Sequence, residues 1–214
     1  MPVSESLPGR FVRAGHDPAK RALDLIVLAL LLPLILPLLA VVWAALVLGG
    51  GQPFYAQTRI GKDGTPFRLW KFRSMIPDAD AALARLCAAD TALAIEWAHN
   101  QKLRHDPRVT RLGRLLRRTS LDELPQLWNV ARGEMSLVGP RPFMAEQEAL
   151  YRAAGGIGYF RLRPGLTGLW QVSDRGRTDF ATRVGFDETY ARTRSLLLDL
   201  RLIAATARAM TEGR

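Results

Sequence analysis

Cysteine and histidine are scarce in this sequence. A single cysteine, Cys87, and three histidines occur among its 214 residues. One cysteine excludes an internal disulfide framework and a cysteine-rich metal site, so the chain suits a reducing compartment. The histidines, His16, His99 and His105, have no metal-ligand spacing, and we expect each to be an ordinary surface or hydrogen-bonded residue.

Several motifs with known chemistry are also absent. The sequence contains no P-loop, no G-x-G-x-x-G after a strand, no C-x-x-C pair and no H-E-x-x-H. It contains no internal repeat and no low-complexity segment. The chemistry must therefore be sought among its carboxylates and arginines.

Acidic residues are the minority among the charges. Thirty Lys and Arg against twenty Asp and Glu give a formal net charge of +10. This balance favours anionic partners, whether nucleic acid, anionic lipid or phosphorylated substrates, and does not choose among them. The length of 214 residues suits one domain with its own core, and we expect one domain plus an anchor.

The longest uncharged stretch predicts a membrane anchor. Residues 25–48, LIVLALLLPLILPLLAVVWAALVL, contain no charged side chain, and they are long enough to cross a hydrocarbon core of roughly 30 Å. Pro33 and Pro37 predict a sharp kink or break near the middle, because each removes a backbone donor and crowds the preceding turn. Each arm is then only about 16 Å long, about half of the bilayer.

The charges on both sides of this run predict that it enters and leaves the membrane on one side. Lys and Arg precede it at 10, 13, 20 and 21 and follow it at 59, 62, 68, 71 and 73, and such residues favour the cytoplasmic face. We expect a re-entrant helix, with a proline-kinked transmembrane helix as the alternative. Lys20, Arg21 and Asp24 at its start are expected to pair with one another or to extend to the headgroup layer.

The remaining chain predicts a mostly helical α+β fold, with amphipathic interfacial helices and a small β-hairpin region around a cytosolic catalytic core. Residues 53–60 and 66–74 alternate aromatic and β-branched side chains around Lys62-Asp63-Gly64, which is typical of a hairpin. Helices are expected over 78–100, from Pro107 to Arg118, from Pro125 to Gly133, and over 178–193 and 195–210. The helix from Pro107 is basic and amphipathic, which suits an anionic membrane or else a solvated protein surface.

Two acidic residues, Asp122 and Glu123, stand side by side in TSLDELPQLWN, directly after the basic run RLGRLLRR. Ser120 and Glu123 match a helix capping box, which is one explanation of the pair. The other is phosphoryl chemistry, in which a carboxylate attacks phosphorus or holds a divalent ion while arginines neutralise phosphate oxygens. Arg141 suits that task, because a proline on each side stiffens its backbone.

A second arginine-containing turn follows later in the chain, in RLRPGLTGLWQV. Arg161 and Arg163 precede its Pro-Gly turn. Gly168 has no side chain, so we expect the backbone there to be open to the approach of a ligand.

Taken in order, these motifs resemble those of the bacterial sugar transferases, the monotopic phosphoglycosyltransferases that move a phosphosugar onto polyprenyl phosphate. The resemblance covers roughly residues 19–212. It rests on KRALD, the proline-containing apolar run, FYAQTRIGKDG, FRLWKFRSM, KLRHDPRVTRLGRLLRRTSLDELPQLWNV, GEMSLVGPRP and RLRPGLTGLWQV. Each piece is modest alone, and their order and number make the match specific.

The resemblance implies a reaction in which a UDP-sugar and undecaprenyl phosphate give undecaprenyl diphosphosugar and UMP. Asp122 would be the nucleophile that attacks the β-phosphorus and carries the phosphosugar. Glu123 would assist with Mg²⁺ and orientation, so both carboxylates are candidate metal ligands. Further phosphate or nucleotide contacts would come from Arg141, Lys71, Arg73 and Arg163.

The resemblance also implies a location and partners. A leader (1–18), an anchoring helix (19–49) and a catalytic domain (50–214) would lie on the cytoplasmic face of the bacterial inner membrane and initiate exopolysaccharide, capsule or O-antigen synthesis. The expected partners are a UDP-sugar, undecaprenyl phosphate and membrane lipids, with a homodimer and downstream glycosyltransferases as further candidates and no nucleic acid. The insertion-like residues 78–105 and the segment QKLRHDPRVTRLGR resemble more closely the relatives that transfer galactose- or glucose-1-phosphate.

The sequence departs from several relatives at the membrane helix, where Leu36-Pro37 replaces a Ser-Pro pair. A serine can bond the backbone that proline frees and a leucine cannot, so we expect the bend to depend on both Pro33 and Pro37. Larger relatives carry a four-helix membrane region ahead of this unit, and we expect the present chain to be a minimal catalytic form.

A membrane-anchored basic module that holds nucleic acid or acidic lipid without catalysis is the alternative function. It predicts that Asp122 is dispensable and that binding falls steeply with salt. The acidic pair argues against it, because a polyanion binder gains nothing from carboxylates beside its arginines.

Overall fold

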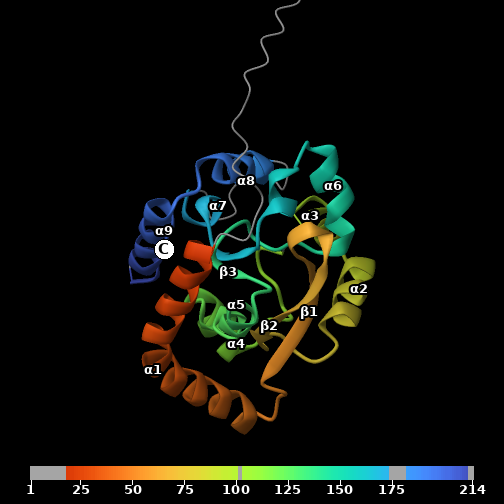
Figure 1. Ribbon diagram of the computed structural model, residues 1–214. Helices are drawn as coiled ribbons and strands as arrows, with labels where there is room; N and C mark the ends of the chain where they lie inside the picture. Colours follow the sequence, from red (N-terminus) through yellow and green to blue (C-terminus); the bar gives the residue numbers. More distant parts are fainter. Residues whose placement is uncertain (1–17, 101–102, 174–181, 212–214) are drawn as a thin grey trace, which may run out of the picture.

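The computed structural model describes residues 18–100, 103–173 and 182–211 (Figure 1). The expected leader, apart from Pro18, and the first residues of the helix expected at 178–193 lie outside these ranges. The described residues are mostly helical, with two sheets of two strands each. The prediction of a mostly helical α+β fold is therefore confirmed.

The apolar run forms one long helix, α1 (Pro18–Leu48), that contains both Pro33 and Pro37. It bends midway: one arm descends beside α9 (Leu196–Thr211), and the other turns beneath the domain (Figure 1). The prolines thus bend the helix without ending it. In the described part of the chain, α1 is the one helix long and apolar enough to cross a membrane.

The charged residues at the start of α1 dock this helix onto the domain. Lys20 Nζ lies 2.6 Å from Asp199 Oδ2 of α9. Arg21 donates to the backbone carbonyls of residues 130 and 131 at 2.6 and 2.8 Å. The buried Asp24 accepts hydrogen bonds from Ser136 Oγ at 3.0 Å and from the next backbone N–H at 3.1 Å. These partners lie far along the chain, and the sequence did not indicate them.

The expected hairpin is confirmed. Strands β1 (Phe54–Ile60) and β2 (Pro66–Phe72) pair antiparallel, joined by a 3₁₀ turn, η1 (Lys62–Gly64). Tyr55 is paired with Lys71, and side chains alternate between the two faces of a strand. Gln57, Arg59 and Lys71 therefore belong to the same face of the hairpin.

A second, parallel pair of strands, β3 (Ser136–Val138) and β4 (Gly165–Thr167), sets the position of Arg141. A Cβ added at Gly168 would lie 2.2 Å from the carbonyl oxygen of Gly139. The space that a side chain at Gly168 would need is therefore occupied by the backbone of Gly139, whereas the sequence had suggested a ligand there.

The other helices are short and cover the hairpin and the strand pair. Their bounds are α2 (Ala79–Ala89), α3 (Thr91–Asn100), α4 (Arg111–Arg118), η2 (Leu121–Glu123), α5 (Gln126–Arg132), η3 (Ala145–Gln147), α6 (Glu148–Ala153), η4 (Gly158–Arg161), α7 (Leu169–Ser173) and α8 (Thr182–Thr193). The short helix ending at Gly133 and the helices near 178–193 and 195–210 agree with prediction over their described residues.

Two helix predictions are wrong in their bounds. The helix expected over 78–100 is divided at Asp90, whose Oδ1 accepts a hydrogen bond from Ala92 N at 2.8 Å and starts α3. The basic helix begins at Arg111 and not at Pro107, because Thr110 Oγ1 accepts from a backbone N–H of the first turn at 2.9 Å. The preceding Arg108 is buried in an ion pair with Asp106 at 2.7 Å.

Three apolar clusters hold these elements together. The largest lies between the first arm of α1, β2, α5, β3 and α9. A second is aromatic and lies beside the end of β1. The third joins the second arm of α1 to the hairpin and α4 through Val42, Leu46, Phe72 and Leu116. Both arms of α1 therefore pack against the same domain.

Candidate active site

The acidic pair lies in η2, the single 3₁₀ turn between α4 and α5. Ser120 has a left-handed backbone with φ of 57° and makes no side-chain cap hydrogen bond. The capping-box explanation is therefore wrong. The next helix, α5, begins at Gln126 and also has no side-chain cap hydrogen bond. Helix capping does not account for the two carboxylates.

Glu123 is held by two cations that come from different parts of the chain. Its Oε1 lies 3.0 Å from Lys71 Nζ at the end of β2 and 2.7 Å from Arg141 Nη2 in the loop after β3. Burial alone would raise the pKa of Glu123, but the charges of Arg141 and Lys71 and the hydrogen bonds that they donate hold the pKa far below its ordinary value. Glu123 is therefore an ionised, fixed group.

Asp122 has the opposite environment. Its side chain is buried, with 7% exposed, and no other described residue forms a hydrogen bond or ion pair with it. Burial raises the pKa of Asp122, the charge of Lys71 opposes this, and the charge of Glu123 adds to it. A carboxylate with a raised pKa and no fixed partner is a stronger nucleophile than one already bound in an ion pair.

The loop that carries Arg141 is fixed on both sides of the arginine. Before it, Gly139 N donates to Thr167 O at 2.9 Å, and Pro140 O accepts from Gly165 N at 2.8 Å. After it, Phe143 O accepts from Ile60 N at 3.0 Å. The guanidinium, 36% exposed, uses one Nη for Glu123, so further N–H groups can bind an anion.

Asn129 is a positioning residue that the sequence analysis missed. It is fully buried on α5, and its amide accepts a hydrogen bond from Trp70 N at 3.1 Å. It also donates to Arg68 O at 2.7 Å and to Glu134 Oε2 at 2.6 Å. Asn129 thus joins α5 by hydrogen bonds to the backbone of β2 at Arg68 and at Trp70, the residue before Lys71. An asparagine between Trp128 and Val130 in a short helical segment was the available signal.

The remaining predicted residues do not contact the acidic pair. Arg73, just after β2, donates to Gln52 Oε1 at 3.1 Å at the surface. Arg163 donates Nε to Gly133 O at 2.8 Å and lines a separate cavity of about 30 Å³. This cavity holds little more than a water molecule, so in this structure Arg163 acts as a link between backbone segments.

The basic helix α4 also contributes to the site. Arg117 donates Nε to Ser74 Oγ at 2.9 Å, and its charge favours ionisation of Asp122. The basic pattern of α4 predicted an anionic membrane or a solvated protein surface and did not indicate a contact with the acidic pair.

The donor set suits a magnesium ion that is shared with a substrate. Among the described residues no group of three or more His, Cys, Asp or Glu could hold a metal. Mg²⁺, however, is commonly bound by one or two carboxylates together with substrate phosphates. Asp122, without a fixed partner, and the second oxygen of Glu123 offer such ligands. These carboxylates therefore fit the ion only together with a phosphate substrate.

Comparison with known proteins adds independent findings. Residues 15–213 match the family model described as "Bacterial sugar transferase". The UDP-galactose-lipid carrier transferase of Erwinia amylovora is 45% identical over 188 residues, which are 87% of this chain and 39% of that protein. The exopolysaccharide production protein ExoY of Sinorhizobium fredii is 44% identical over 197 residues, which are 92% of this chain and 87% of ExoY.

A third relative is the UDP-glucose:undecaprenyl-phosphate glucose-1-phosphate transferase of Escherichia coli, 39% identical over 195 residues. The present chain spans 39% of this protein and of the Erwinia protein, and most of ExoY. The similarity therefore covers a common unit that occurs both in larger proteins and nearly alone.

Proposed function

The chain belongs to the bacterial sugar transferase family, and from this we propose that it transfers a hexose-1-phosphate from a UDP-sugar to undecaprenyl phosphate. The product would be undecaprenyl diphosphosugar, the starting unit of an exopolysaccharide, capsule or O-antigen, and UMP would be released. The observation that carries the proposal is the contrast within the acidic pair. One carboxylate is locked by two cations, and the other is buried beside them with no hydrogen-bond or ion-pair partner among the described residues.

In the first step, an oxygen of Asp122 attacks the β-phosphorus of the donor. The bond from that phosphorus to the bridging oxygen breaks, and UMP departs with the electron pair. Lys71 and Arg141 lie beside the reacting phosphate and neutralise its oxygens, while Glu123 holds both cations in place. The result is a phosphosugar joined to Asp122 as an acyl phosphate.

In the second step, an oxygen of undecaprenyl phosphate attacks the same phosphorus and frees the Asp122 carboxylate. Because both displacements occur at one phosphorus, the soluble donor and the lipid acceptor need never be bound together. Asp122 and the second oxygen of Glu123 would hold Mg²⁺, which would supply positive charge to the diphosphate.

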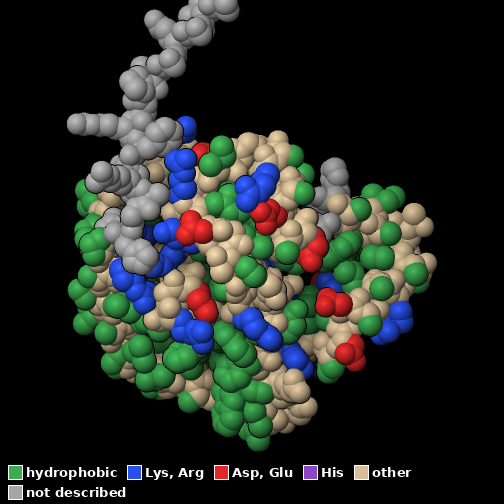
Figure 2. All heavy atoms as spheres, turned by 45° about the vertical axis from the view of Figure 1, so that its right-hand side comes forward, with side chains coloured by type: hydrophobic (Ala, Val, Ile, Leu, Met, Phe, Trp, Pro, Cys, Tyr) green, Lys and Arg blue, Asp and Glu red, His purple; other side chains and the backbone are tan. Residues whose placement is uncertain are grey.

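The packing of α1 supports an anchor that enters and leaves on one face of the membrane. Its first arm packs in the main cluster through Leu28, and its second arm packs beside the hairpin through Val42 and Leu46. A helix that crossed the bilayer would place its ends on opposite sides, away from a single domain. The outward side chains are apolar, among them Leu30, Leu34 and Val41. Figure 2 shows hydrophobic side chains gathered at the lower end of the molecule, with Lys and Arg above them.

The donor sugars to be tested first follow from the relatives. Their names specify galactose and glucose, so we propose one of these two hexoses. The catalytic domain would then lie on the cytoplasmic face of the inner membrane, where UDP-sugars are made.

The experiment is an assay of UMP release in nanodiscs with Mg²⁺, undecaprenyl phosphate and a panel of UDP-sugars. We expect UMP with UDP-galactose or UDP-glucose from the wild-type protein and none from Asp122→Asn. Arg68→Gln is a matched control, because Arg68 is exposed on the other face of β2, and it should retain full activity. If Asp122→Asn released UMP as fast as the wild type, the proposal would fail and a non-catalytic basic module would be favoured.

A further inference from the structure

Arg59 is the second-last residue of β1. Its charge has no acidic partner among the described residues. Its Nη2 donates to Gln57 Oε1 at 2.6 Å, and its Nη1 lies 3.4 Å from Pro142 O. Its Nε is buried and forms no hydrogen bond within the described part of the chain. A partly buried guanidinium held only by neutral groups is costly unless an anion completes its surroundings.

Other guanidinium groups stand close to Arg59. The contact with Pro142 places Arg59 next to Arg141. Phe143 follows in the same loop, and the guanidinium of Arg183 from α8 lies 5.8 Å from the centre of the Phe143 ring. Burial, and then the charges of Arg141 and Arg183, lower the pKa of Arg59 to about 10. Arg141 and Arg183 are each paired with a carboxylate, Glu123 and Asp187, whereas Arg59 has no acidic partner among the described residues, so its charge favours binding of an anion.

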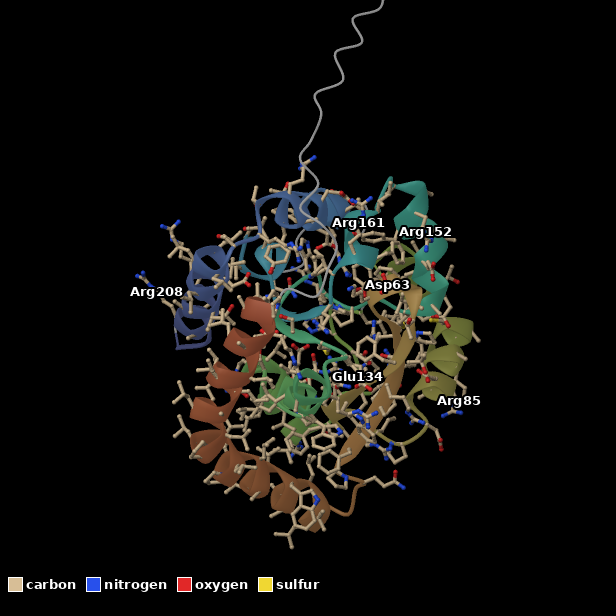
Figure 3. The ribbon with its side chains drawn as sticks, viewed as in Figure 1. Asp63, Arg85, Glu134, Arg152, Arg161 and Arg208 are labelled. Carbon is tan, nitrogen blue, oxygen red and sulfur yellow. The ribbon has the colours of Figure 1, made fainter. Side chains whose placement is uncertain are left out.

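Arg59 lies at the end of the hairpin opposite the second arm of α1, next to η1, whose Lys62 lines a small cavity together with Lys20 and Asp24 at the start of α1. It shares a face with Lys71 but is four residues further along the ladder, a distance of about 13 Å. At the Lys71 end, Phe72 packs against Val42 and Leu46 of α1. At the Arg59 end, η1 approaches η4, and Figure 3 shows Asp63 and Arg161 together there, in the upper part of the molecule. In Figure 1 the second arm of α1 lies at the bottom.

This position favours a soluble phosphate over a lipid phosphate. The second arm of α1, which carries the exposed apolar Val41, lies at the other end of the hairpin, so we expect a lipid headgroup to approach from there and a nucleotide in solution to approach from the Arg59 end. Arg141 lies between the two ends, since its Nη2 contacts Glu123 and the carbonyl of the next residue, Pro142, contacts Arg59. The arginines thus lead from the acidic pair to Arg59.

We propose that Arg59 binds the α-phosphate of the nucleotide donor, the phosphate that departs as UMP. The proposal rests on the proposed function and adds the residue that recognises the leaving group. When Asp122 attacks the β-phosphorus, the bond to the bridging oxygen breaks and its electron pair stays on UMP. The Arg59 guanidinium neutralises that charge through the Nη hydrogens that Gln57 and Pro142 do not occupy.

Steady-state kinetics of Arg59→Gln and Arg59→Lys test this assignment. Loss of a charged hydrogen-bonded contact should raise KM for the UDP-sugar about 10- to 100-fold in Arg59→Gln and leave KM for undecaprenyl phosphate unchanged. Inhibition by UMP should weaken by a similar factor. Arg59→Lys keeps the charge but not the fork of donors, so its KM should lie between the two. Arg68→Gln is the control on the opposite face of the hairpin.

A binding measurement separates this inference from the proposed function. UDP is titrated into Asp122→Asn, which cannot turn over, and into Asp122→Asn combined with Arg59→Gln. Weaker UDP binding in the double variant supports the subsite even if Asp122 proves dispensable for UMP release. Unchanged UDP affinity, in protein whose thermal midpoint matches the single variant, overturns the subsite even if Asp122 is the nucleophile. A rise in KM for undecaprenyl phosphate alone also overturns it, since the site would then belong to the acceptor. If Arg59→Gln does not fold, Arg59→Lys decides by the same criteria.

Discussion

The sharpest structural prediction concerns Asn129, which ties α5 to the hairpin. In Asn129→Leu the side chain keeps a similar volume but loses three hydrogen bonds, with Trp70 N, Arg68 O and Glu134 Oε2. Each contributes about 1 kcal/mol, and the one to the carboxylate contributes somewhat more, so the expected loss of unfolding free energy is about 3 to 4 kcal/mol. For a chain of this size that corresponds to a thermal midpoint lowered by about 10 °C.

The assay is thermal unfolding in a fixed detergent, followed by UMP release at a temperature where the variant is folded. Because Lys71 follows Trp70 directly, freeing this edge of β2 should also lower kcat while the protein remains folded. Glu134→Gln is the matched control, since it keeps an acceptor for Asn129, and its midpoint should stay within about 2 °C. A midpoint for Asn129→Leu within the same range would refute the reasoning, because the three bonds would then contribute nothing net.

Further predictions follow from the site, from α8 and from the anchor. Asp122 must be ionised to attack, and its pKa is raised, so kcat/KM should increase with pH through a midpoint above 3.8. Lys71→Met should move that midpoint upward, because the charge of Lys71 lowers the pKa of Asp122. A Lys71→Met profile that coincides with the wild type would contradict this. Burial raises the pKa of Asp187 from 3.8 to about 6, so the folded state holds this proton more tightly than the unfolded state. The contribution of protonated Asp187 to the free energy of unfolding should be complete below pH 3.8 and should be lost, by about 3 kcal/mol, as the pH rises to about 6. Chemical unfolding of Asp187→Asn at several pH values should show a smaller fall. Leu34 on α1 is 75% exposed, so Leu34→Glu should weaken vesicle binding about 100-fold in a flotation assay without changing the thermal midpoint in detergent. Ile157→Glu, at an exposed apolar residue away from α1, is its control and should float like the wild type.

Local patterns predicted the elements whose structure is decided locally. The hairpin followed from alternation around a Lys-Asp-Gly turn, and the end of α5 followed from Gly133, which adopts the left-handed backbone that ends helices. The bounds failed at Asp90 and Thr110, where single side chains cap a backbone that the averaged helical pattern runs across.

Contacts between distant segments were beyond the sequence pattern. Asp24 looked like a headgroup residue within an anchor, and only the fold brings Ser136 to it. Arg59 was one of several positive charges after the apolar run, and its role depends on the loop at Pro142. Asp122 and Glu123 were found as a pair from the sequence. Their different environments depend on Lys71 and Arg141, which only the folded chain brings to Glu123.

The central claim is that Asp122 carries the phosphosugar between the two displacements. The most direct measurement is the intact mass of the protein after acid quenching, following a brief incubation with UDP-galactose or UDP-glucose and Mg²⁺ without undecaprenyl phosphate. We predict that the wild-type mass increases by one hexose phosphate, that addition of undecaprenyl phosphate removes the increase, and that Asp122→Asn shows none. An active wild-type protein with no such adduct at any quench time, or an adduct that persists in Asp122→Asn, would contradict the account.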